Sequence, residues 1–250
     1  KIFNKNYKLI VVDNNSKDRT LEILKKFKVE TIKINKFLPG KALNDGIRES
    51  SGEFIVCISA HCIPKDKYWL KNLHKHFSGN KKYAGVYGRQ LPLSYTSDAD
   101  KRDLLITFGQ DQKIQVKDYF FHNAHSAFFR KVWEQFPFSE SLTNIEDREF
   151  GKNLIDNNYF IYYNPIPTVF HYHGIHQSNN KKRLDGVIRI IRSLTGDIEF
   201  KDIEITRVHV YSFVFSWIVC IDPKIDYTIH KCAYILRERR YLFYITWLVV

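Results

Sequence analysis

The first 80 residues alternate between short runs of β-branched residues and stretches in which apolar side chains have helical spacing. Residues 8–12, 29–34 and 54–59 are typical of strands, and each is followed by a predicted helix. This alternation favours a parallel α/β sheet with right-handed crossovers. The run at 54–59, FIVCIS, is apolar almost throughout, which is typical of a strand buried on both faces.

Two polar positions fall where ligands bind in such sheets, beyond the carboxyl ends of the strands. Asp13 ends the first predicted strand, and the segment 59–62 follows the third. Neither lies in a glycine-rich phosphate loop, because the sequence contains no GxGxxG, GxxxxGKS or GxxxxGKT pattern. This argues against a dinucleotide-binding enzyme and against a P-loop NTPase.

The chain has 250 residues, with 39 basic and 27 acidic side chains and a formal net charge of +12. This excess favours an anionic partner such as nucleic acid, a phosphate-bearing substrate or an anionic membrane surface, without choosing among them. Aromatic residues make up 15% of the chain, which excludes intrinsic disorder. The cysteines at positions 57, 62, 220 and 232 show no CxxC spacing, so buried reduced thiols are expected.

The second half of the chain changes character. Residues 84–176 hold many aromatic residues and tight polar groups, with a predicted helix at 147–157 and a predicted strand at 160–163. Beyond residue 178 the pattern becomes basic and helical. Two apolar stretches, 210–221 and 241–250, are shorter than the ~20 residues that a membrane-spanning helix needs.

Several motifs resemble those of family 2 glycosyltransferases, which have the GT-A fold. Residues 11–20, VVDNNSKDRT, resemble the first signature, VVD-(N/D)-(G/N)-S-x-D-x-T. Residues 40–55 resemble the next, G-x-A-x-N-x-G-I followed by G-E-(Y/F)-I. Three later segments, residues 137–140, 146–147 and 163–171, resemble the family's PF-x-E, ED and Y-x-P…V-x-H elements, in that order. The resemblance covers residues 9–177 and implies a mostly parallel central sheet flanked by helices.

Two features depart from the family pattern. The family's first strand would lie upstream of Lys1, so the chain is expected to lack this strand and its natural N-terminus. The DxD motif that closes the third strand is replaced, with Ser59 and His61 at the positions of its two aspartates. The resulting Ser-Ala-His-Cys segment resembles the variant of a bacterial subgroup of polysaccharide and lipopolysaccharide sugar transferases.

The resemblance implies a site for a nucleotide-diphosphate sugar donor. Asp13 would hold the base or the ribose, and the alternative is a turn or helix-capping role. Asp18 is equally compatible with capping the following helix, and Lys41 with a solvated surface position. The implied donor-binding residues are Asp13, Asn15, Asp18, Lys41, Asn44, Ser59, His61 and Arg89.

The leaving diphosphate in such enzymes usually needs a divalent cation such as Mn²⁺ or Mg²⁺. Serine is a poor ligand and histidine a nitrogen ligand, so two outcomes stay open. In one, His61 binds a softer ion together with His171 or His173. In the other, His61, Arg89 and lysines neutralise the phosphates without a metal.

The acidic pair Glu146–Asp147 supplies the predicted catalytic group. An inverting displacement needs one carboxylate within hydrogen-bond reach of the acceptor hydroxyl. The resemblance assigns this general base to Asp147 and leaves Glu146 to orient the acceptor or the base. The alternative is that both acids only favour a helix N-terminus. Asn123 and His125 are expected to line the acceptor side.

The sequence thus predicts an N-terminally truncated GT-A domain at residues 1–177 and a basic, aromatic helical extension at 178–250. The predicted activity is inverting sugar transfer to a growing cell-surface glycan of capsule, O-antigen or lipopolysaccharide type, with a glycan or lipid-linked glycan as acceptor. The predicted location is cytoplasmic, in peripheral contact with the anionic inner face of the plasma membrane. The alternative is a non-catalytic sugar-nucleotide-binding fragment or subunit. Nucleic-acid binding rests on the charge alone and is not expected.

Overall fold

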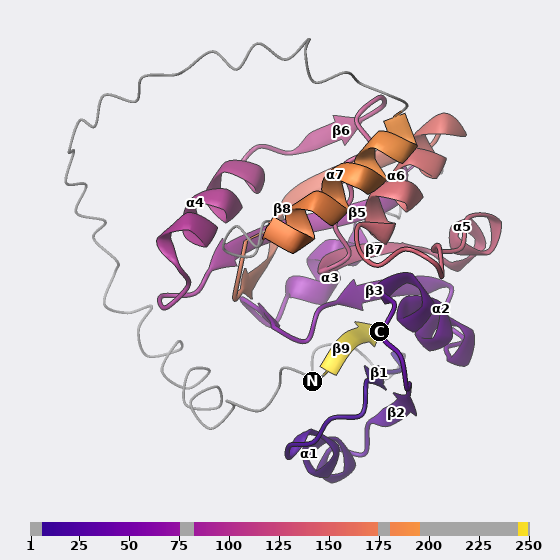
Figure 1. Cartoon of the computed structure of the whole chain (residues 1–250), viewed down its shortest axis with the longest axis vertical. Helices are drawn as coiled ribbons and strands as arrows, with labels where there is room; N and C mark the ends of the chain where they lie inside the picture. Colours follow the sequence, from indigo (N-terminus) through magenta and orange to yellow (C-terminus); the bar gives the residue numbers. More distant parts are fainter. Residues whose placement is uncertain (1–6, 76–82, 175–180, 196–244, 250) are drawn as a thin grey trace.

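The computed structural model describes residues 7–75, 83–174, 181–195 and 245–249, which form a nine-stranded sheet with helices packed against it (Figure 1). In chain order the strands are β1 (Ile10–Asp13), β2 (Glu30–Lys33), β3 (Phe54–Ile58), β4 (Cys62–Pro64), β5 (Tyr83–Pro92), β6 (Lys113–Gln115), β7 (His125–Phe129), β8 (Phe160–His171) and β9 (Ile245–Val249). The helices are α1 (Thr20–Lys26), α2 (Pro39–Glu49), α3 (Trp69–His74), α4 (Asp98–Thr107), α5 (Arg130–Gln135), α6 (Glu146–Asp156) and α7 (Lys181–Thr195).

The strand order is β2-β1-β9-β3-β7-β5-β8-β4, and β6 pairs with β8 outside this path. β1 runs parallel to β2, and β5 runs parallel to β8. β7 lies between β3 and β5 and is antiparallel to both. The sheet is therefore mixed, where the sequence predicted a mostly parallel one, because periodicity within a strand does not show which strand lies beside it.

Strand β9 lies between β1 and β3 and is antiparallel to both (Figure 1). The sequence predicted a helical extension for residues 178–250. Within that range the structure describes helix α7 and this strand, which belongs to the central sheet. Because both β1 and β3 are antiparallel to β9, they run in the same direction, and their carboxyl ends lie at one edge of the sheet.

Successive side chains of β3 enter two cores on opposite faces of the sheet, as the alternation of a strand requires. Ile55 and Cys57 pack in a cluster that includes residues of α2, α5 and α6, with many aromatic side chains. Val56 and Ile58 pack in a second cluster that includes residues of α3. Burial on both faces confirms the reading of FIVCIS as an interior strand.

Strand β8 is much longer than the predicted strand at 160–163 and continues to His171. Its ladder with β5 is interrupted, because Asn164 pairs with Gly88 and Thr168 pairs with Arg89. The intervening residues 165–167 contain two prolines, which cannot donate to a ladder, and they form the irregularity. The sequence did not predict that the regular segments before and after these residues form one strand.

Cys57 and Cys62 are free and buried, as expected, and burial raises the pKa of both thiols. Cys220, Cys232 and the apolar stretch 210–221 lie outside the described residues. Among the helices that the structure describes, none combines the length and the apolar character needed to cross a bilayer.

Candidate functional site

A cluster of three imidazoles forms beyond the carboxyl end of β3. The chain turns after Ser59, and β4 then pairs with the end of β8, with Cys62 opposite His171. This pairing brings together His61, His171 and His173, whose ring centroids lie 4.6 to 4.9 Å apart. One nitrogen from each ring lies within 4.8 Å of the others. The cluster sits where the sequence predicted the replaced DxD motif.

His171 is the buried member of the cluster, with 2% of its surface exposed. Its Nδ1 lies 2.6 Å from the side-chain oxygen of Gln90, while its Nε2 is buried without a hydrogen-bond partner. Burial lowers the pKa of His171 well below its usual range, and the neighbouring imidazoles of His61 and His173 act in the same direction. A buried nitrogen that no protein group satisfies is a position where a ligand is expected.

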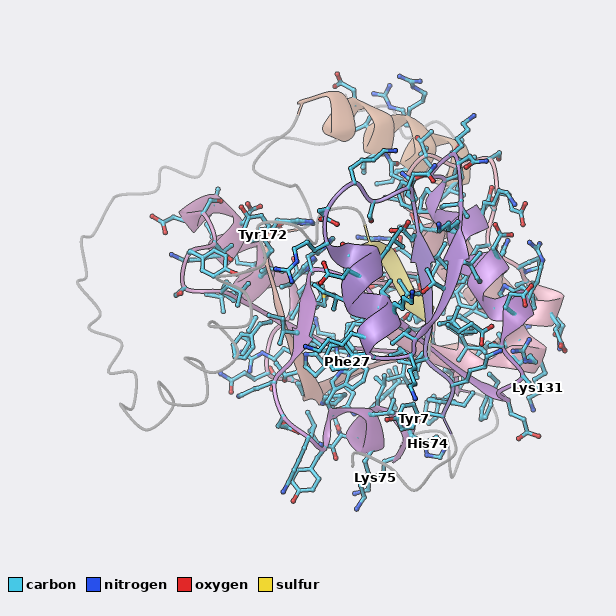
Figure 2. All side chains as sticks on the ribbon, turned by 90° about the horizontal axis from the view of Figure 1, so that it is seen from below. Tyr7, Phe27, His74, Lys75, Lys131 and Tyr172 are labelled. Carbon is cyan, nitrogen blue, oxygen red and sulfur yellow. The ribbon has the colours of Figure 1, made fainter. Side chains whose placement is uncertain are left out.

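The outer two histidines are less buried. His173 is half-buried, and its Nδ1 lies 2.9 Å from the carbonyl oxygen of Gly174. His61 is partly exposed, and its Nε2 lies 2.9 Å from the hydroxyl of the buried Ser59. Beyond the cluster, Tyr172 lies at the surface with its ring 5.8 Å from that of Tyr95 (Figure 2).

The three nitrogens suit a divalent cation that accepts imidazole ligands, such as Zn²⁺, Co²⁺ or Mn²⁺. Two metal–nitrogen bonds of about 2.1 Å span at most about 4.2 Å. The separations of up to 4.8 Å exceed this span, and the rings of His61 and His171 are stacked with an interplanar angle of 4°, so the side chains must rotate to direct their nitrogens at one ion. The residues fit a cation of this class better than Mg²⁺, which prefers oxygen ligands.

The two carboxylates of the ED pair lie at the start of α6. Ile145, just before the helix, has a left-handed backbone with φ of 51°, and it turns the chain into α6. Glu146 and Asp147 are only 4% and 8% exposed. The backbone N–H of Asn123 donates to Asp147 at 3.1 Å, and its side-chain amide lies 3.3 Å from the Glu146 carboxylate. Arg148 stacks on the ring of Phe120, with its guanidinium carbon 3.8 Å from the centroid.

The imidazole cluster and the carboxylate pair share one edge of the sheet. The backbone N–H of Ser59 donates to the carbonyl of Ala124 at 3.0 Å, and the preceding residue, Asn123, holds the carboxylates. Asp13, at the end of β1, lies at the same edge because β1 and β3 run in the same direction. The three stretches that the sequence singled out therefore lie at one edge of the sheet.

Within the first of these stretches, the polar side chains make local contacts. Asp13 is fully buried and accepts hydrogen bonds from the backbone N–H and the hydroxyl of Ser16. Asn15 is exposed, and its amide lies 3.3 Å from Asn35. Asp18 accepts a hydrogen bond from the backbone N–H of Thr20 at 2.9 Å. These contacts are turn roles of the kind that the sequence left open as an alternative, and α1 has no side-chain capping hydrogen bond.

Among the residues predicted around the nucleotide, Lys41 and Arg89 remain on the surface. Lys41 is exposed and pairs with Asp45 at 3.1 Å. Arg89 is half-buried, and its Nε donates to the carbonyl of Phe108 at 3.2 Å. Both keep further guanidinium or ammonium hydrogens for a phosphate.

Asn44 is different, because every polar atom of its side chain is used. Its oxygen accepts from Trp133 and from the backbone of Phe138, and its amide donates to Phe138 and Glu140. An asparagine side chain can make four hydrogen bonds in all, two accepted by its oxygen and two donated by its amide nitrogen. Asn44 therefore ties α2 to the segment that carries the PF-x-E motif, and a donor-binding role for it is corrected on this ground.

The two residues predicted on the acceptor side are both buried with 0% exposure. Asn123 contacts the carboxylates of Glu146 and Asp147. Its influence on the acceptor side would therefore be indirect, through these two carboxylates. His125 accepts a hydrogen bond from the indole of Trp69 at 2.6 Å, and burial lowers its pKa to about 3. In this structure His125 packs against Trp69 inside the protein and has no exposed surface to present to an acceptor.

Two residues of the site were missed as candidates, Gln90 and His122. Gln90 is fully buried, and its side chain lies between His171 and His122. The sequence showed both within tight polar groups, at 88–90 and 122–125. Their role depends on the pairing of β5 with β8, which no local pattern reveals.

A mixed sheet flanked by helices, with polar residues gathered at the carboxyl edge, defines the GT-A class of glycosyltransferase fold. The solved structure of S. aureus TarS 1–349 superposes with a TM-score of 0.57 at 16% identity, covering 77% of this chain and 56% of that one. The mannosyltransferase PcManGT from Pyrobaculum calidifontis, solved with GDP-Man and Mn²⁺, has a TM-score of 0.53 at 17% identity, covering 73% of this chain and 54% of that one.

The sequence profile of glycosyl transferase family 2 matches residues 1–136, more than half of the chain, and the chain belongs to this family. A dolichyl N-acetyl-alpha-D-glucosaminyl phosphate 3-beta-D-2,3-diacetamido-2,3-dideoxy-beta-D-glucuronosyltransferase of Methanococcus voltae is 27% identical over 177 residues, 64% of this chain and 55% of the relative. The O-antigen chain rhamnosyltransferase RfbN of Salmonella typhimurium is 27% identical over 185 residues, 67% of this chain and 57% of the relative. The chain thus spans about half the length of these curated relatives.

Proposed function

We propose that this chain transfers a sugar from a nucleotide-diphosphate donor to a growing cell-surface glycan, with inversion at the anomeric carbon. The observation that carries the proposal is the single edge shared by the imidazole cluster and the ED carboxylates, joined through the hydrogen bond from Ser59 to Ala124. Such an edge offers one place for the leaving diphosphate and another, close by, for the acceptor hydroxyl. The names of the two curated relatives, which act on a dolichyl-linked sugar and on O-antigen, support this class of acceptor.

In the proposed reaction, Asp147 accepts the proton of the acceptor hydroxyl while that oxygen bonds to the anomeric carbon. The bond from the anomeric carbon to the diphosphate oxygen breaks in line, and the nucleoside diphosphate leaves with the electron pair. Asn123 fixes the Asp147 carboxylate through a backbone hydrogen bond of 3.1 Å. Glu146, held by the Asn123 side chain, orients the acceptor or the base. A general base of this kind contributes about 10²–10⁴ to the rate.

We assign the base or ribose of the donor to the end of β1, where Asp13, Asn15 and Asp18 lie, and its phosphates to the side of Lys41, Ser59 and Arg89. Asp13 and Asp18 keep carboxylate lone pairs beyond their local contacts. The solved relatives that contain UDP-GlcNAc or GDP-Man support a donor of this chemical class.

We further propose that His61, His171 and His173 hold a divalent cation, which stabilises the charge of the leaving diphosphate when bound. Carbonyl oxygens only accept hydrogen bonds, so the Nδ1 atoms of His171 and His173 donate to Gln90 and Gly174. The His171 ring then offers a lone pair at Nε2, which suits a cation and not a bare phosphate. This favours a metal over direct neutralisation by imidazoles. It also gives a function to the Ser-Ala-His-Cys segment that replaces DxD.

The helix α7 supports a place for the protein at the inner, anionic face of a membrane. Arg189 and Arg192 are exposed, and Ile188 and Ile191 are only half-buried. A helix with exposed basic residues and a partly exposed apolar stripe suits a lipid interface. α7 passes close to the start of α6, because a side chain on Gly186 would lie 3.2 Å from the amide of Asn144 (Figure 1). A lipid-linked acceptor arriving there would be near Asp147.

The test is sugar transfer by the full-length protein, measured with labelled nucleotide sugars and detergent-solubilised lipid-linked glycan. Asp147→Asn should lower the turnover number by about 10²–10⁴ while donor binding in calorimetry is retained. Glu149→Gln is the matched control, because it also removes one negative charge from the first turn of α6. If the acids served only the helix N-terminus, the two variants would lose activity equally.

Donor binding without turnover by the wild-type protein, over a full panel of nucleotide sugars, would instead support the non-catalytic sugar-binding alternative. Equal turnover by wild type and Asp147→Asn would refute the base assignment while leaving the transferase activity intact. The two results separate the activity from the residue that is proposed to drive it.

A further inference from the structure

The side chain of Gln90 bridges two imidazoles inside the protein. Gln90 has 0% of its surface exposed and projects from β5 toward the end of β8. Its oxygen lies 2.6 Å from Nδ1 of His171, and its nitrogen lies 3.0 Å from Nδ1 of His122. The bridge lies behind the imidazole cluster, on the side away from the free Nε2 of His171.

The chemistry of the amide decides where the imidazole protons are. An amide oxygen only accepts a hydrogen bond, and an amide NH₂ only donates one. His171 must therefore carry its proton on Nδ1, and His122 must present a lone pair there. With Nδ1 protonated, the neutral His171 ring has its lone pair on Nε2, the buried nitrogen that has no hydrogen-bond partner.

We infer that Gln90, oriented by His122, is a positioning residue that fixes His171 in the one tautomer able to bind a cation. This inference rests on the cation site of the proposed function and adds the residues that prepare it. Gln90 contacts neither donor nor acceptor and acts only through His171. Outer partners that fix the tautomer of a histidine ligand typically contribute 10–100-fold to metal affinity.

The bridge holds the His171 proton on one nitrogen. Without an acceptor at Nδ1, the ring can carry its proton on either nitrogen. The form with the proton on Nε2 has no lone pair at that nitrogen, so His171 could not bind a cation through Nε2. Gln90 is fully buried and lies opposite Val169 of β8, so the fold sets the position of the bridge.

The experiment reads the tautomer and the metal affinity separately, on the full chain. Long-range ¹H–¹⁵N NMR of the histidine rings reports which His171 nitrogen is protonated in the metal-free protein, and calorimetry with Co²⁺ reports affinity. Gln90→Met removes the acceptor at similar length, whereas Gln90→Glu keeps an oxygen opposite His171. Gln115→Met is the matched control, since Gln115 is also buried but bonds to Tyr87 and two carbonyls away from the cluster.

We expect wild-type His171 to be protonated on Nδ1, and Gln90→Met to lose this preference and to bind Co²⁺ about 10–100-fold more weakly. Gln90→Glu should bind Co²⁺ at least as tightly as wild type, and Gln115→Met should keep wild-type affinity. A wild-type ring protonated on Nε2 would overturn the inference without any variant, even if Gln90→Met fails to fold. So would a folded Gln90→Met protein with an unchanged tautomer and unchanged affinity.

The failure of the proposed cation site would look different. If wild-type protein binds no Co²⁺ but Gln90→Met still shifts the His171 tautomer, the positioning role of Gln90 is supported and the cation is removed from the proposed function. If Co²⁺ binds to wild type and Gln90→Met alike, the cation site is supported and the role of Gln90 is refuted.

Discussion

Replacing Gly88 by alanine should destabilise the protein far more than the addition of one methyl group suggests. Gly88 lies on β5, two residues before Gln90. A methyl group there would lie within 3.0 Å of two ring atoms of His125 and of the carbonyl oxygen of Pro167. Real side chains do not tolerate such distances, and the carbonyl belongs to the backbone of β8, so either the ring or the strand must move.

The magnitude has two parts. Forcing one extra carbon into a packed core costs about 1–3 kcal/mol. Moving the His125 ring also endangers the buried hydrogen bond from the indole of Trp69 at 2.6 Å, and an unsatisfied buried donor costs about 1–3 kcal/mol. The midpoints together give about 4 kcal/mol, which for a chain of this size lowers the melting temperature by about 8–16 °C.

The assay is urea unfolding followed by tryptophan fluorescence, with Gly109→Ala as the control. A methyl group at Gly109 meets no atom within 4 Å, so that variant should stay within about 1 kcal/mol of wild type. In the double variant Gly88→Ala/His125→Ala, two of the three obstacles disappear, so the combined loss should be smaller than the sum of the single losses. Gly88→Ala as stable as Gly109→Ala would refute the packing argument.

Three further predictions concern charge. Burial lowers the pKa of His125 to about 3, so the unfolded chain binds more protons than the folded protein as the pH falls below 6.5. The free energy of unfolding in urea should therefore fall by up to ~1.4 kcal/mol per pH unit because of this group, and His125→Gln should flatten the dependence of that free energy on pH between pH 6.5 and 4.5. His61→Ala and His171→Ala should each weaken Co²⁺ or Zn²⁺ binding by ~10-fold or more in calorimetry. The control His74→Ala, on α3, should leave this binding unchanged, and Mg²⁺ should bind weakly to all three variants. Arg189→Ala should weaken sedimentation with anionic vesicles about 5-fold, the equivalent of about 1 kcal/mol, and should leave binding to neutral vesicles unchanged; equal losses on both kinds of vesicle would contradict an electrostatic contribution of α7.

Apart from the short strand β4, the strands and helices of the first 75 residues were predictable because each is short, regular and bounded by polar turns. Asp13 and Ser59 fall at strand ends in the structure as the sequence indicated. Periodicity could not show that β7 separates β3 from β5 or that β9 enters the sheet, because strand order depends on contacts between distant segments. The full length of β8 was not predicted either, because its two prolines interrupt the residue pattern of a single strand.

For the site, motifs located the residues but not their partners. His61, His171 and His173 meet, as one of the two outcomes left open by the sequence requires. Asn44 and His125 were plausible polar candidates, yet each accepts a hydrogen bond from a tryptophan indole inside the protein. An amide or imidazole looks the same in a sequence whether it faces a substrate or a buried tryptophan, so only the fold can separate the two cases.

The proposed replacement of two aspartates by Ser59 and His61 would change the charge that the site presents. Two carboxylate ligands would cancel the charge of a dication, whereas three neutral imidazoles leave it uncancelled toward the diphosphate. Negative charge is present one layer farther out, because a side chain on Gly174 would lie within 3.0 Å of carboxylate oxygens of both Asp100 and Asp103 on α4. These acids lie behind the turn that carries His173. A carboxylate at this greater distance offsets less of the cation's field than a direct ligand would, since the Coulomb energy falls with separation. Donor affinity in this protein should therefore depend more steeply on the bound cation than it does in a relative with two aspartates at the same positions.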